Sequence, residues 1–471
     1  MASRRDQLHS YQFMMQRVIS SIMLRETDPE QTPLRRGVGA VFGGVMLAGL
    51  LAIAFAVYGV ISGNYGARWQ QEGAIVIERE TGAHFVYQDG VLQPVINYAS
   101  ARLLTDGSNV QRVASRNLAD VPRAVPVGIP GAPDSLPPTS RVVGRPWTIC
   151  SAQGRDQAGS SVTTTLLLVG TPAAGGVPLG DGALFVKDSD AGTRYLLWQG
   201  RRYRITGDDP DAVIRSLYGF QAQVVEVGTA WLNSLPAGQD IGPIPIERFG
   251  EESDAVHGRS VGDVVFHSVA NGRQYYLVLD DGLAHLTELQ MLLVRGHYEV
   301  EPEEITAAAA NAAPVSNALD PASDDAAPPV APPELRPVTG DTTPLCAETT
   351  DAASTPVLTL DADLTVATPA IPTIAESPEG VRLADWVLVP PGHIAVVRAV
   401  ASDTTDIGAY HLVTDVGLRF PVPSVDALGM LGYAPEHAVD MPAALVQRIP
   451  TGPTLDPYAA RLPADPGSVA R

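Results

Sequence analysis

The feature that most constrains how this chain can fold is an uncharged stretch over residues 37–67. Its inner part, GVGAVFGGVMLAGLLAIAFAVYGVIS, is apolar across the roughly 20 residues that a helix needs to cross a lipid bilayer. We therefore predict one transmembrane helix over residues 37–63. An N-terminal segment of residues 1–36 precedes it, and most of the chain follows it.

Basic residues flank the predicted helix on one side only. Arg35 and Arg36 abut its start, whereas the next Lys or Arg is Arg68. The positive-inside rule then places residues 1–36 in the cytoplasm and the remainder outside the cell (inner) membrane, in a periplasmic or extracytoplasmic position. A cleavable signal peptide is the alternative. It is disfavoured because the apolar stretch is longer than a signal h-region and begins too far from Met1.

The N-terminal segment carries apolar residues at helical spacing among polar neighbours, which is typical of an amphipathic helix. Such a helix can lie on the inner membrane surface or dock on another membrane protein. The apolar residues are Leu8, Tyr11, Phe13, Met14, Met15, Val18, Ile19, Ile22 and Met23.

Charge excludes one class of partner for the region after the membrane helix. The chain has 32 basic and 52 acidic residues among 471, a formal net charge of −20. The first 36 residues hold six Arg and four acidic residues, a local charge of +2, so the rest carries −22. Because binding of nucleic acid needs clustered Lys and Arg, we expect no nucleic-acid partner.

The chain contains only two cysteines, Cys150 and Cys346, both in the region predicted to lie outside the cytoplasm. An even number of cysteines in an oxidising compartment favours one structural disulfide. A redox or metal site is the alternative, but neither cysteine lies in a CxxC motif or beside a His cluster. We favour the disulfide.

Four stretches of the chain align with one another, and each is typical of a β-hairpin. Every stretch begins with Gly, alternates like a strand, and turns at a Gly that follows Asp or Gln by one or two positions. The turn glycines, which supply the positive φ of a tight hairpin, are Gly90, Gly200, Gly282 and Gly417. The stretches are GAHFVYQDGVLQPV (82–95), GTRYLLWQGRRYRI (192–205), GRQYYLVLDDGLAHLT (272–287) and GAYHLVTDVGLRFPV (408–422).

Each hairpin has a predicted strand before it and a short helical pattern after it, so the expected repeat unit is three strands and a helix. The preceding strands are residues 74–78, 183–187, 263–267 and 394–398, and the helical patterns are residues 96–104, 211–220, 286–294 and 424–432. Aromatic residues within the hairpins are candidates for interface anchors or for the hairpin core. These are Tyr195, Trp198, Tyr275 and Tyr276.

The segments between the repeats predict a central body. The expected fold class is α+β and mainly β: four hairpin and helix repeats around a central β core, with one N-terminal transmembrane helix. Solvated linkers or binding arms are expected at residues 301–345 and from residue 451, which are rich in Ala, Pro and acidic residues. The predicted units are repeat 1 (68–125), a core part (141–180), repeat 2 (181–220), a core part (221–257), repeat 3 (258–300), an Ala/Pro-rich acidic connection containing Cys346 (301–380), repeat 4 (381–435) and a Pro-rich tail (436–471).

No motif in the sequence predicts a catalytic, cofactor-binding or metal-binding residue. A GxxxxGK[ST] phosphate loop is absent, and the sole lysine, Lys187, lies inside a predicted strand, so ATP binding has no support. The GxSxG string at residues 258–262 lacks the strand-turn-helix context of a nucleophile elbow. The nine histidines show no HExxH motif or close metal-ligand spacing. We therefore expect no cofactor.

Several motifs together resemble the EccB family, the ESX conserved component B of actinobacterial type VII secretion. They are the opening MASRRDQLHSYQFMMQR, PLRR before the membrane segment, Trp69-x-x-x-Gly73, IExxTG from Ile77, and FVYQDGVLQPVINYASARLL. The likeness is densest over residues 1–110. It continues through PWTIC at Cys150, the later repeats and PxGPxL from Pro450.

The resemblance implies a structural component of the type VII secretion membrane complex, with a disulfide across the chain. Its expected partners are the EccC motor ATPase, EccD, EccE, the mycosin protease and further copies of itself in an outer ring that helps export WXG-type proteins. The family is also labelled a putative ATPase, a label that no motif here supports. The competing hypotheses are an ATP-hydrolysing protein and a cell-wall-binding module.

Overall fold

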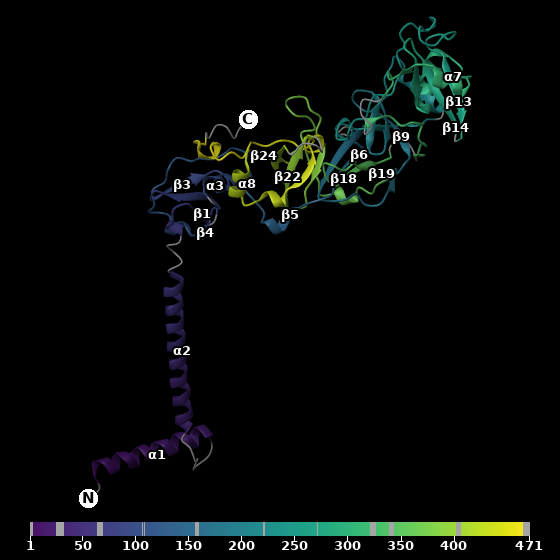
Figure 1. The fold of residues 1–471 in the computed structure, drawn as a ribbon. Coiled ribbons are helices and arrows are strands. Elements are labelled where there is room, and N and C mark those ends of the chain that lie inside the picture. Colours follow the sequence, from purple (N-terminus) through teal and green to yellow (C-terminus); the bar gives the residue numbers. More distant parts are fainter. Residues whose placement is uncertain are drawn as a thin grey trace.

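The protein consists of two N-terminal helices followed by an elongated body of strands and short helices (Figure 1). The computed structural model describes residues 3–24, 33–63, 69–105, 107, 109–155, 160–219, 222–270, 272–320, 326–338, 343–401 and 407–464. The body is mainly β, so the predicted α+β fold class is confirmed.

Helix α1 spans Arg4–Leu24 and helix α2 spans Pro33–Gly63. Within α2, Gly37–Gly59 form 23 residues with a mean hydropathy of 2.4 that the rest of the chain leaves uncovered. Large side chains such as Phe42 and Phe55 are 70% and 73% exposed. Such a surface is stable only in an apolar solvent, so α2 has the length and composition of a membrane span. It is the single such helix among the described residues.

Four sheets of the body share one strand order, and we call each sheet with its helix a module. Three consecutive strands form an antiparallel meander, a helix follows, and a fourth strand pairs in parallel with the first strand. The helix is therefore a crossover between parallel strands.

The modules have the following elements. Module 1 contains β1 Ala74–Glu78, β2 His84–Gln88, β3 Val91–Val95, α3 Tyr98–Leu104 and β4 Val110–Val113. Module 2 contains β9 Ala183–Asp188, β10 Arg194–Trp198, β11 Arg201–Arg204, α4 Pro210–Tyr218 and β12 Val224–Val227. Module 3 contains β13 Val264–Val269, β14 Gly272–Val278, β15 Leu283–Leu286, α6 Glu288–Tyr298 and β16 Glu303–Glu304. Module 4 contains β22 Ile394–Val400, β23 Gly408–Thr414, β24 Arg419–Val422, α8 Val425–Leu431 and β25 Val439–Pro442.

The fourth strand is a feature that the expected three-strand unit lacked. These strands are short edge strands of two to four residues, too short to show a clear alternation. In module 3 the strand is only Glu303–Glu304, both exposed. In module 2 the fourth strand is β12, a segment that the sequence assigned to the central body.

A proline closes the other edge of every module. The backbone N–H of the third strand donates to a proline carbonyl, and the residue after that proline pairs in parallel with the strand. Each proline lies 32 to 36 residues after the turn glycine. Proline suits an outermost segment because its missing N–H needs no partner there. The donors and acceptors are Leu92 to Pro122, Arg202 to Pro236, Leu283 to Pro314 and Arg419 to Pro450, at 2.8–3.0 Å.

A seven-stranded central sheet joins the modules, with the order β20-β21-β7-β6-β18-β19-β8. Helices α5 (Thr229–Leu232) and α9 (Ala443–Val446) contribute to its core, where the Trp231 indole N–H donates to the Ile149 carbonyl at 3.0 Å. The strands are β6 Trp147–Arg155, β7 Ser161–Val169, β8 Val177–Pro178, β18 Leu345–Thr349, β19 Val357–Leu360, β20 Ile371–Pro372 and β21 Trp386–Leu388.

The remaining short elements lie between these units. Strand β5 pairs with β22, and β17 pairs with β15. They are β5 Val142–Val143, α7 Ala307–Ala312 and β17 Val315–Ser316.

The modules pack in two pairs on either side of the central sheet. Along the body in Figure 1 the order is module 1, module 4, central sheet, module 2 and module 3. Helix α3 packs on α8, and helix α4 packs on α6. The first pair shares a core that includes Leu103 and Leu428. The second pair shares a core that includes Leu217 and Leu293.

Two segments expected to be solvated linkers or binding arms are fixed to the body. Residues 326–338 lie against modules 2 and 3, where the Tyr218 hydroxyl donates to the Pro333 carbonyl at 2.8 Å. Residues 451–464 bridge modules 4 and 1: Leu455 and Ala460 are fully buried, and the Ala464 N–H donates to Pro126 at 2.9 Å. Each segment is held by a few apolar side chains and backbone hydrogen bonds, which leave no periodic pattern in the sequence.

The contact between α4 and α6 depends on a glycine, and this can be tested. A Cβ at Gly296 would lie 2.4 Å from the Cβ of Ser216, so Gly296→Ala should force the helices apart and cost about 1–3 kcal/mol of unfolding free energy. The measurement is chemical unfolding of the detergent-solubilised full chain. The matched control is Gly429→Ala in α8, where no atom lies within 4 Å and alanine should stabilise by up to about 1 kcal/mol.

A double substitution separates the clash from other effects of Gly296→Ala. Adding Ser216→Gly removes the opposing Cβ, so it should recover part of the lost stability in a double-mutant cycle. Equal effects of Ala at Gly296 and Gly429 would contradict close packing of α4 on α6.

Candidate functional site

The two cysteines are joined in a buried disulfide between β6 and β18. Cys150 and Cys346 face each other in the antiparallel register, and their Cα atoms are 4.0 Å apart. Both side chains are buried, in a cluster with Leu166, Leu168 and Leu388. The predicted structural disulfide is confirmed, and the redox or metal alternative is not needed.

The disulfide closes the base of a large insertion in the central sheet. The two cysteines are 196 residues apart in the sequence. The segment between them contains the whole of modules 2 and 3, which lie between β7 and β18 in the chain. A cross-link at this position keeps the two halves of the body joined at one sheet. It therefore acts on the relative placement of the module pairs as well as on stability.

Removing the disulfide should lower the stability of the body. We expect Cys150→Ala with Cys346→Ala to lose roughly 2–5 kcal/mol, because the cross-link restricts the unfolded chain over a long loop. The measurement is the thermal midpoint of the full chain in detergent, with and without reductant. Reductant should lower the midpoint of the wild type and leave the double variant unchanged. Identical midpoints for wild type and variant would contradict this role.

The four turn glycines have positive φ angles: Gly90 78°, Gly200 72°, Gly282 150° and Gly417 75°. Two of them also permit a close backbone approach. A Cβ at Gly200 would lie 2.2 Å from the Pro356 carbonyl oxygen, and one at Gly282 would lie 2.3 Å from the Pro314 carbonyl oxygen. The turns at Gly200 and Gly282 thus pack closely against neighbouring segments of the chain.

The hairpin aromatics are half-buried and contribute to cores. Tyr195 packs against the central core and Trp198 against the core shared by modules 2 and 3. Tyr275 and Tyr276 pack within module 3. Each side chain keeps one part in solvent. Arg35 and Arg36 lie in the first turn of α2, and their side chains are outside the described part of the structure.

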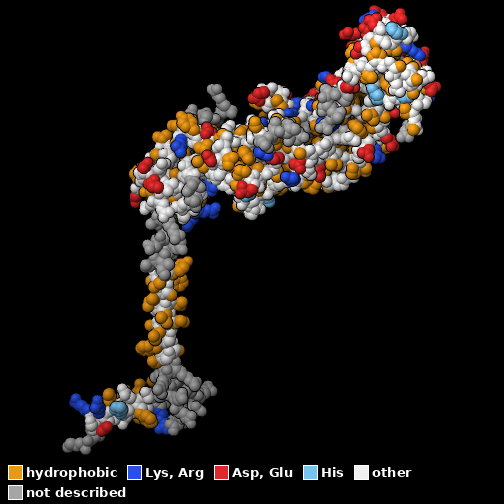
Figure 2. All heavy atoms as spheres, in the orientation of Figure 1, with side chains coloured by type: hydrophobic (Ala, Val, Ile, Leu, Met, Phe, Trp, Pro, Cys, Tyr) orange, Lys and Arg blue, Asp and Glu red, His pale blue; other side chains and the backbone are white. Residues whose placement is uncertain are grey.

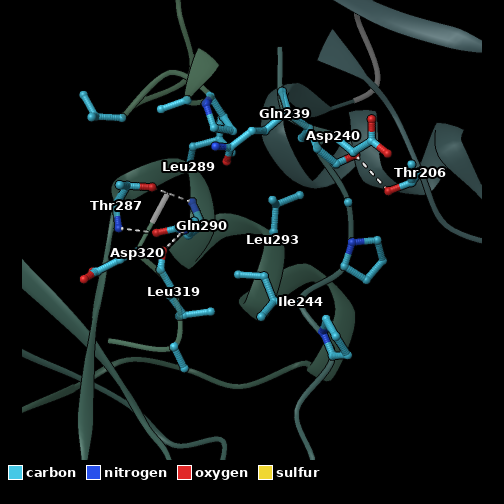
Figure 3. Close-up of a pocket in the computed structure, with 18 of the residues that line it drawn as sticks. Thr206, Gln239, Asp240, Ile244, Thr287, Leu289, Gln290, Leu293, Leu319 and Asp320 are labelled. Atoms are coloured by element: carbon cyan, nitrogen blue, oxygen red, sulfur yellow. Dashed lines mark hydrogen bonds between the residues drawn. The ribbon is translucent and has the colours of Figure 1, made fainter. Parts of the chain in front are cut away.

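A pocket of about 410 Å³ lies at the junction of modules 2 and 3. Figure 3 shows Leu293 and Ile244 in its middle, with Thr287, Gln290 and Asp320 on one side and Asp240 on the other. Several of its polar side chains already have partners within the chain. Thr287 and Gln290 form the capping box of α6, and Asp240 pairs with Arg204.

The chemistry of this junction suits an apolar group better than a phosphate. A second pocket of about 440 Å³ adjoins the first and is lined by Asp208 and Asp209. No Lys or Arg lines either pocket. Because a nucleotide site needs cations or free N–H groups to hold phosphate charge, acidic rims disfavour ATP at these two pockets.

The structure provides no catalytic arrangement at the GxSxG string. Ser260 forms a β-bridge with Glu252 just before the turn that leads into β13, and its N–H donates to Asp263 Oδ2 at 2.9 Å. Within the described residues, no group of three His, Cys, Asp or Glu side chains has metal-binding geometry.

A buried histidine lies on the module 4 face that packs towards the central sheet. His411 is 7% exposed, and its Nδ1 atom is buried without a hydrogen-bond partner. Burial, with a smaller contribution from Arg419, lowers the pKa of His411 to about 4. The folded protein therefore holds this imidazole neutral.

This lowered pKa predicts a loss of stability in mild acid. The unfolded state binds the proton more readily than the folded state. The contribution of neutral His411 to the free energy of unfolding is therefore fully present above pH 6.5 and is lost as the pH falls from about 6.5 towards 4. This contribution is roughly 3 kcal/mol. We expect His411→Leu to remove this part of the pH dependence, measured by denaturant unfolding at several pH values. His257→Leu, at an exposed position, is the control and should keep the wild-type slope. An unchanged slope in His411→Leu would contradict the assignment.

Comparison with known proteins places this architecture in a family. A family model described as type VII secretion system ESX-1, transport TM domain B, matches residues 1–467. The ESX-3 secretion system ATPase EccB3 of Mycobacterium tuberculosis is 27% identical, in an alignment covering 98% of this chain and 89% of the relative. The EccB3 protein of Mycolicibacterium smegmatis is 26% identical, covering 96% and 89%.

Solved structures agree with this match. A chain of an intact ESX-5 inner membrane complex has a TM-score of 0.62 and 26% identity, covering 99% of this chain and 96% of that chain. A chain of an EccB3 dimer from the ESX-3 core complex has a TM-score of 0.61 at 23% identity, covering 83% and 100%, and supports the fold alone.

Among the described residues, a single helix with the length and composition of a membrane span precedes a large modular body closed by a disulfide, as in a subunit of a membrane complex. With a family model matched over almost its whole length, the chain belongs to the EccB family, the transport transmembrane component B of type VII secretion systems. The resemblance drawn from the sequence motifs is confirmed.

Proposed function

We propose that this protein is a structural component of a type VII secretion membrane complex and works by binding its partners. The observation that carries the proposal is the family match over residues 1–467, which includes both the span and the modular body. A relative with 26% identity forms part of an ESX-5 inner membrane complex. Two module pairs joined through one central sheet suit a scaffold because they present separate surfaces to partners.

The proposed orientation places α1 in the cytoplasm and the body outside the cell membrane. Arg35 and Arg36 before the apolar stretch support this orientation through the positive-inside rule. The disulfide supports it independently, because disulfides persist in oxidising compartments.

The proposed partners are the EccC motor ATPase, EccD, EccE, the mycosin protease and further copies of the chain in a ring. A relative with 26% identity belongs to an intact ESX-5 inner membrane complex, which supports assembly with other subunits. Helix α1 offers a docking face towards the membrane complex. Exposed Leu8, Tyr11, Met15, Val18 and Ile22 follow helical spacing along one side of it.

We propose a role without ATP hydrolysis, although curated relatives carry the word ATPase in their names. The sequence has no phosphate loop, and the two pockets between modules 2 and 3 have acidic rims. The described body also lies on the proposed outer side, away from cytoplasmic ATP.

Extraction of the tagged full chain from its native membrane in mild detergent tests the scaffold proposal. We expect a very large species on a native gel that contains the motor ATPase and the other ESX membrane components by mass spectrometry. A variant with Leu8→Glu, Met15→Glu and Ile22→Glu should assemble less, because charges then interrupt the apolar face of α1. Migration of the wild type alone, as a monomer or small homo-oligomer, would overturn the proposal.

A thermal-shift measurement tests the absence of nucleotide binding. The purified full chain should melt at the same temperature with and without millimolar ATP and magnesium, since a ligand that binds the folded state raises the midpoint. A reproducible rise with ATP, together with phosphate release, would instead support an enzyme.

A further inference from the structure

Module 1 carries a group of exposed arginines at the edge formed by β4. Arg112 lies in β4, and Arg79 follows β1, which pairs with β4. The Arg79 Nη2 atom donates to the Arg112 carbonyl at 3.4 Å, so the two residues are neighbours. Arg116 lies just beyond β4, in the short 3-10 helix Ser115–Asn117. All three side chains are exposed.

These arginines have no carboxylate partner within 4.0 Å in the described part of the chain. The neighbouring carboxylate of Glu80 is held by Ser115, which donates from its N–H at 2.8 Å and its hydroxyl at 2.9 Å. The guanidinium groups therefore remain available to an external anion.

Their position in the molecule is distinctive, because the chain after residue 36 carries a net charge of −22. Figure 2 shows Lys and Arg side chains gathered on the side of module 1 where the chain arrives from α2, close to β4 in Figure 1. Positive charge thus collects where the acidic body comes nearest to the membrane helix.

Chain length limits how far module 1 can lie from the membrane surface. Trp69 is 3% exposed in the module 1 core, and α2 ends at Gly63. Six residue steps span at most about 20 Å, even when fully extended. Exposed Tyr58, near the end of the apolar segment, is the type of residue that lies at a membrane interface.

We propose that Arg79, Arg112 and Arg116 form a surface that binds the phosphate headgroups of anionic phospholipids in the membrane that α2 crosses. The proposal rests on the membrane anchoring proposed above. A guanidinium group matches a phosphate with two parallel hydrogen bonds, and partial burial against a headgroup layer strengthens the attraction. The contact fixes which side of the body faces the bilayer and so orients the surfaces offered to partners.

Energy transfer in lipid nanodiscs tests the contact on the full chain. Asn117→Cys, at an exposed site beside Arg116, accepts a donor fluorophore, while the native cysteines are held in their disulfide. Discs contain an acceptor lipid in phosphatidylcholine, with or without phosphatidylglycerol. We expect phosphatidylglycerol to increase the transfer, and 0.5 M salt to abolish the increase by screening.

Charge-removing variants identify the residues responsible. Arg79→Gln, Arg112→Gln and Arg116→Gln together should weaken the response to phosphatidylglycerol, by about fivefold per arginine. The corresponding Lys variant should keep most of the response because the charge remains. The matched control changes Arg248, Arg259 and Arg295 in the module 3 half to Gln, with the same change in net charge, and should respond as the wild type does. A thermal midpoint within about 2–3 degrees of wild type verifies folding of each variant.

The outcomes separate this inference from the proposed function. A chain that enters the discs but shows equal transfer in both lipids overturns the lipid contact and leaves the membrane anchor intact. If the triple Gln variant shows the same increase in energy transfer with phosphatidylglycerol as the wild type, other residues cause the lipid effect. This result also overturns the inference. If the triple variant unfolds, Arg112→Gln alone must still reduce the response. A probe at Val269→Cys in module 3 should show no lipid dependence, and failure of the chain to enter the discs would contradict the anchor itself.

Discussion

The pairing of β6 with β18 is the contact on which the arrangement of the body depends. β6 is bound by β7 on one edge and by β18 on the other, and the strand that returns from modules 2 and 3 is β18 itself. The bond from Cys150 to Cys346 crosses this pair in a buried apolar cluster. On the opposite side of the sheet, Trp147 and Trp231 join a core that also receives side chains from modules 2 and 4. Because both module pairs contact the central sheet, this sheet sets the position of one pair relative to the other.

Each module protects its own sheet, which explains how four copies coexist in one chain without pairing wrongly. The crossover helix covers one face, the fourth strand covers one edge, and the segment after a proline covers the other edge. Exposed sheet edges invite pairing with other chains, so covering them is a common requirement of β proteins. The modules instead associate through their helices, as at the close approach of Gly296 to Ser216.

Much of this architecture could be predicted from the sequence, and the failures have physical causes. The hairpins are predictable because a glycine turn between alternating strands is a local signal, as at Gly90 and Gly200. The fourth strands are not predictable because parallel pairing is long-range, and two glutamates in β16 carry no strand pattern. The repeated proline is present in the sequence at a nearly regular spacing after each turn glycine, at Pro122, Pro236, Pro314 and Pro450. An alignment of the four copies that extends beyond their helices contains it.

The sequence by itself determined the membrane span, the four hairpins, the even cysteine count and the family. All four are local or compositional properties: an uncharged apolar run, an alternation with a turn residue, a count and a set of motifs. Only the tertiary structure decided which modules pair, that residues 326–338 and 451–464 are part of the body, and that Arg79 and Arg112 lie side by side. These depend on contacts between residues distant in the chain, whose free energy comes from burial and pairing that no short window of sequence records.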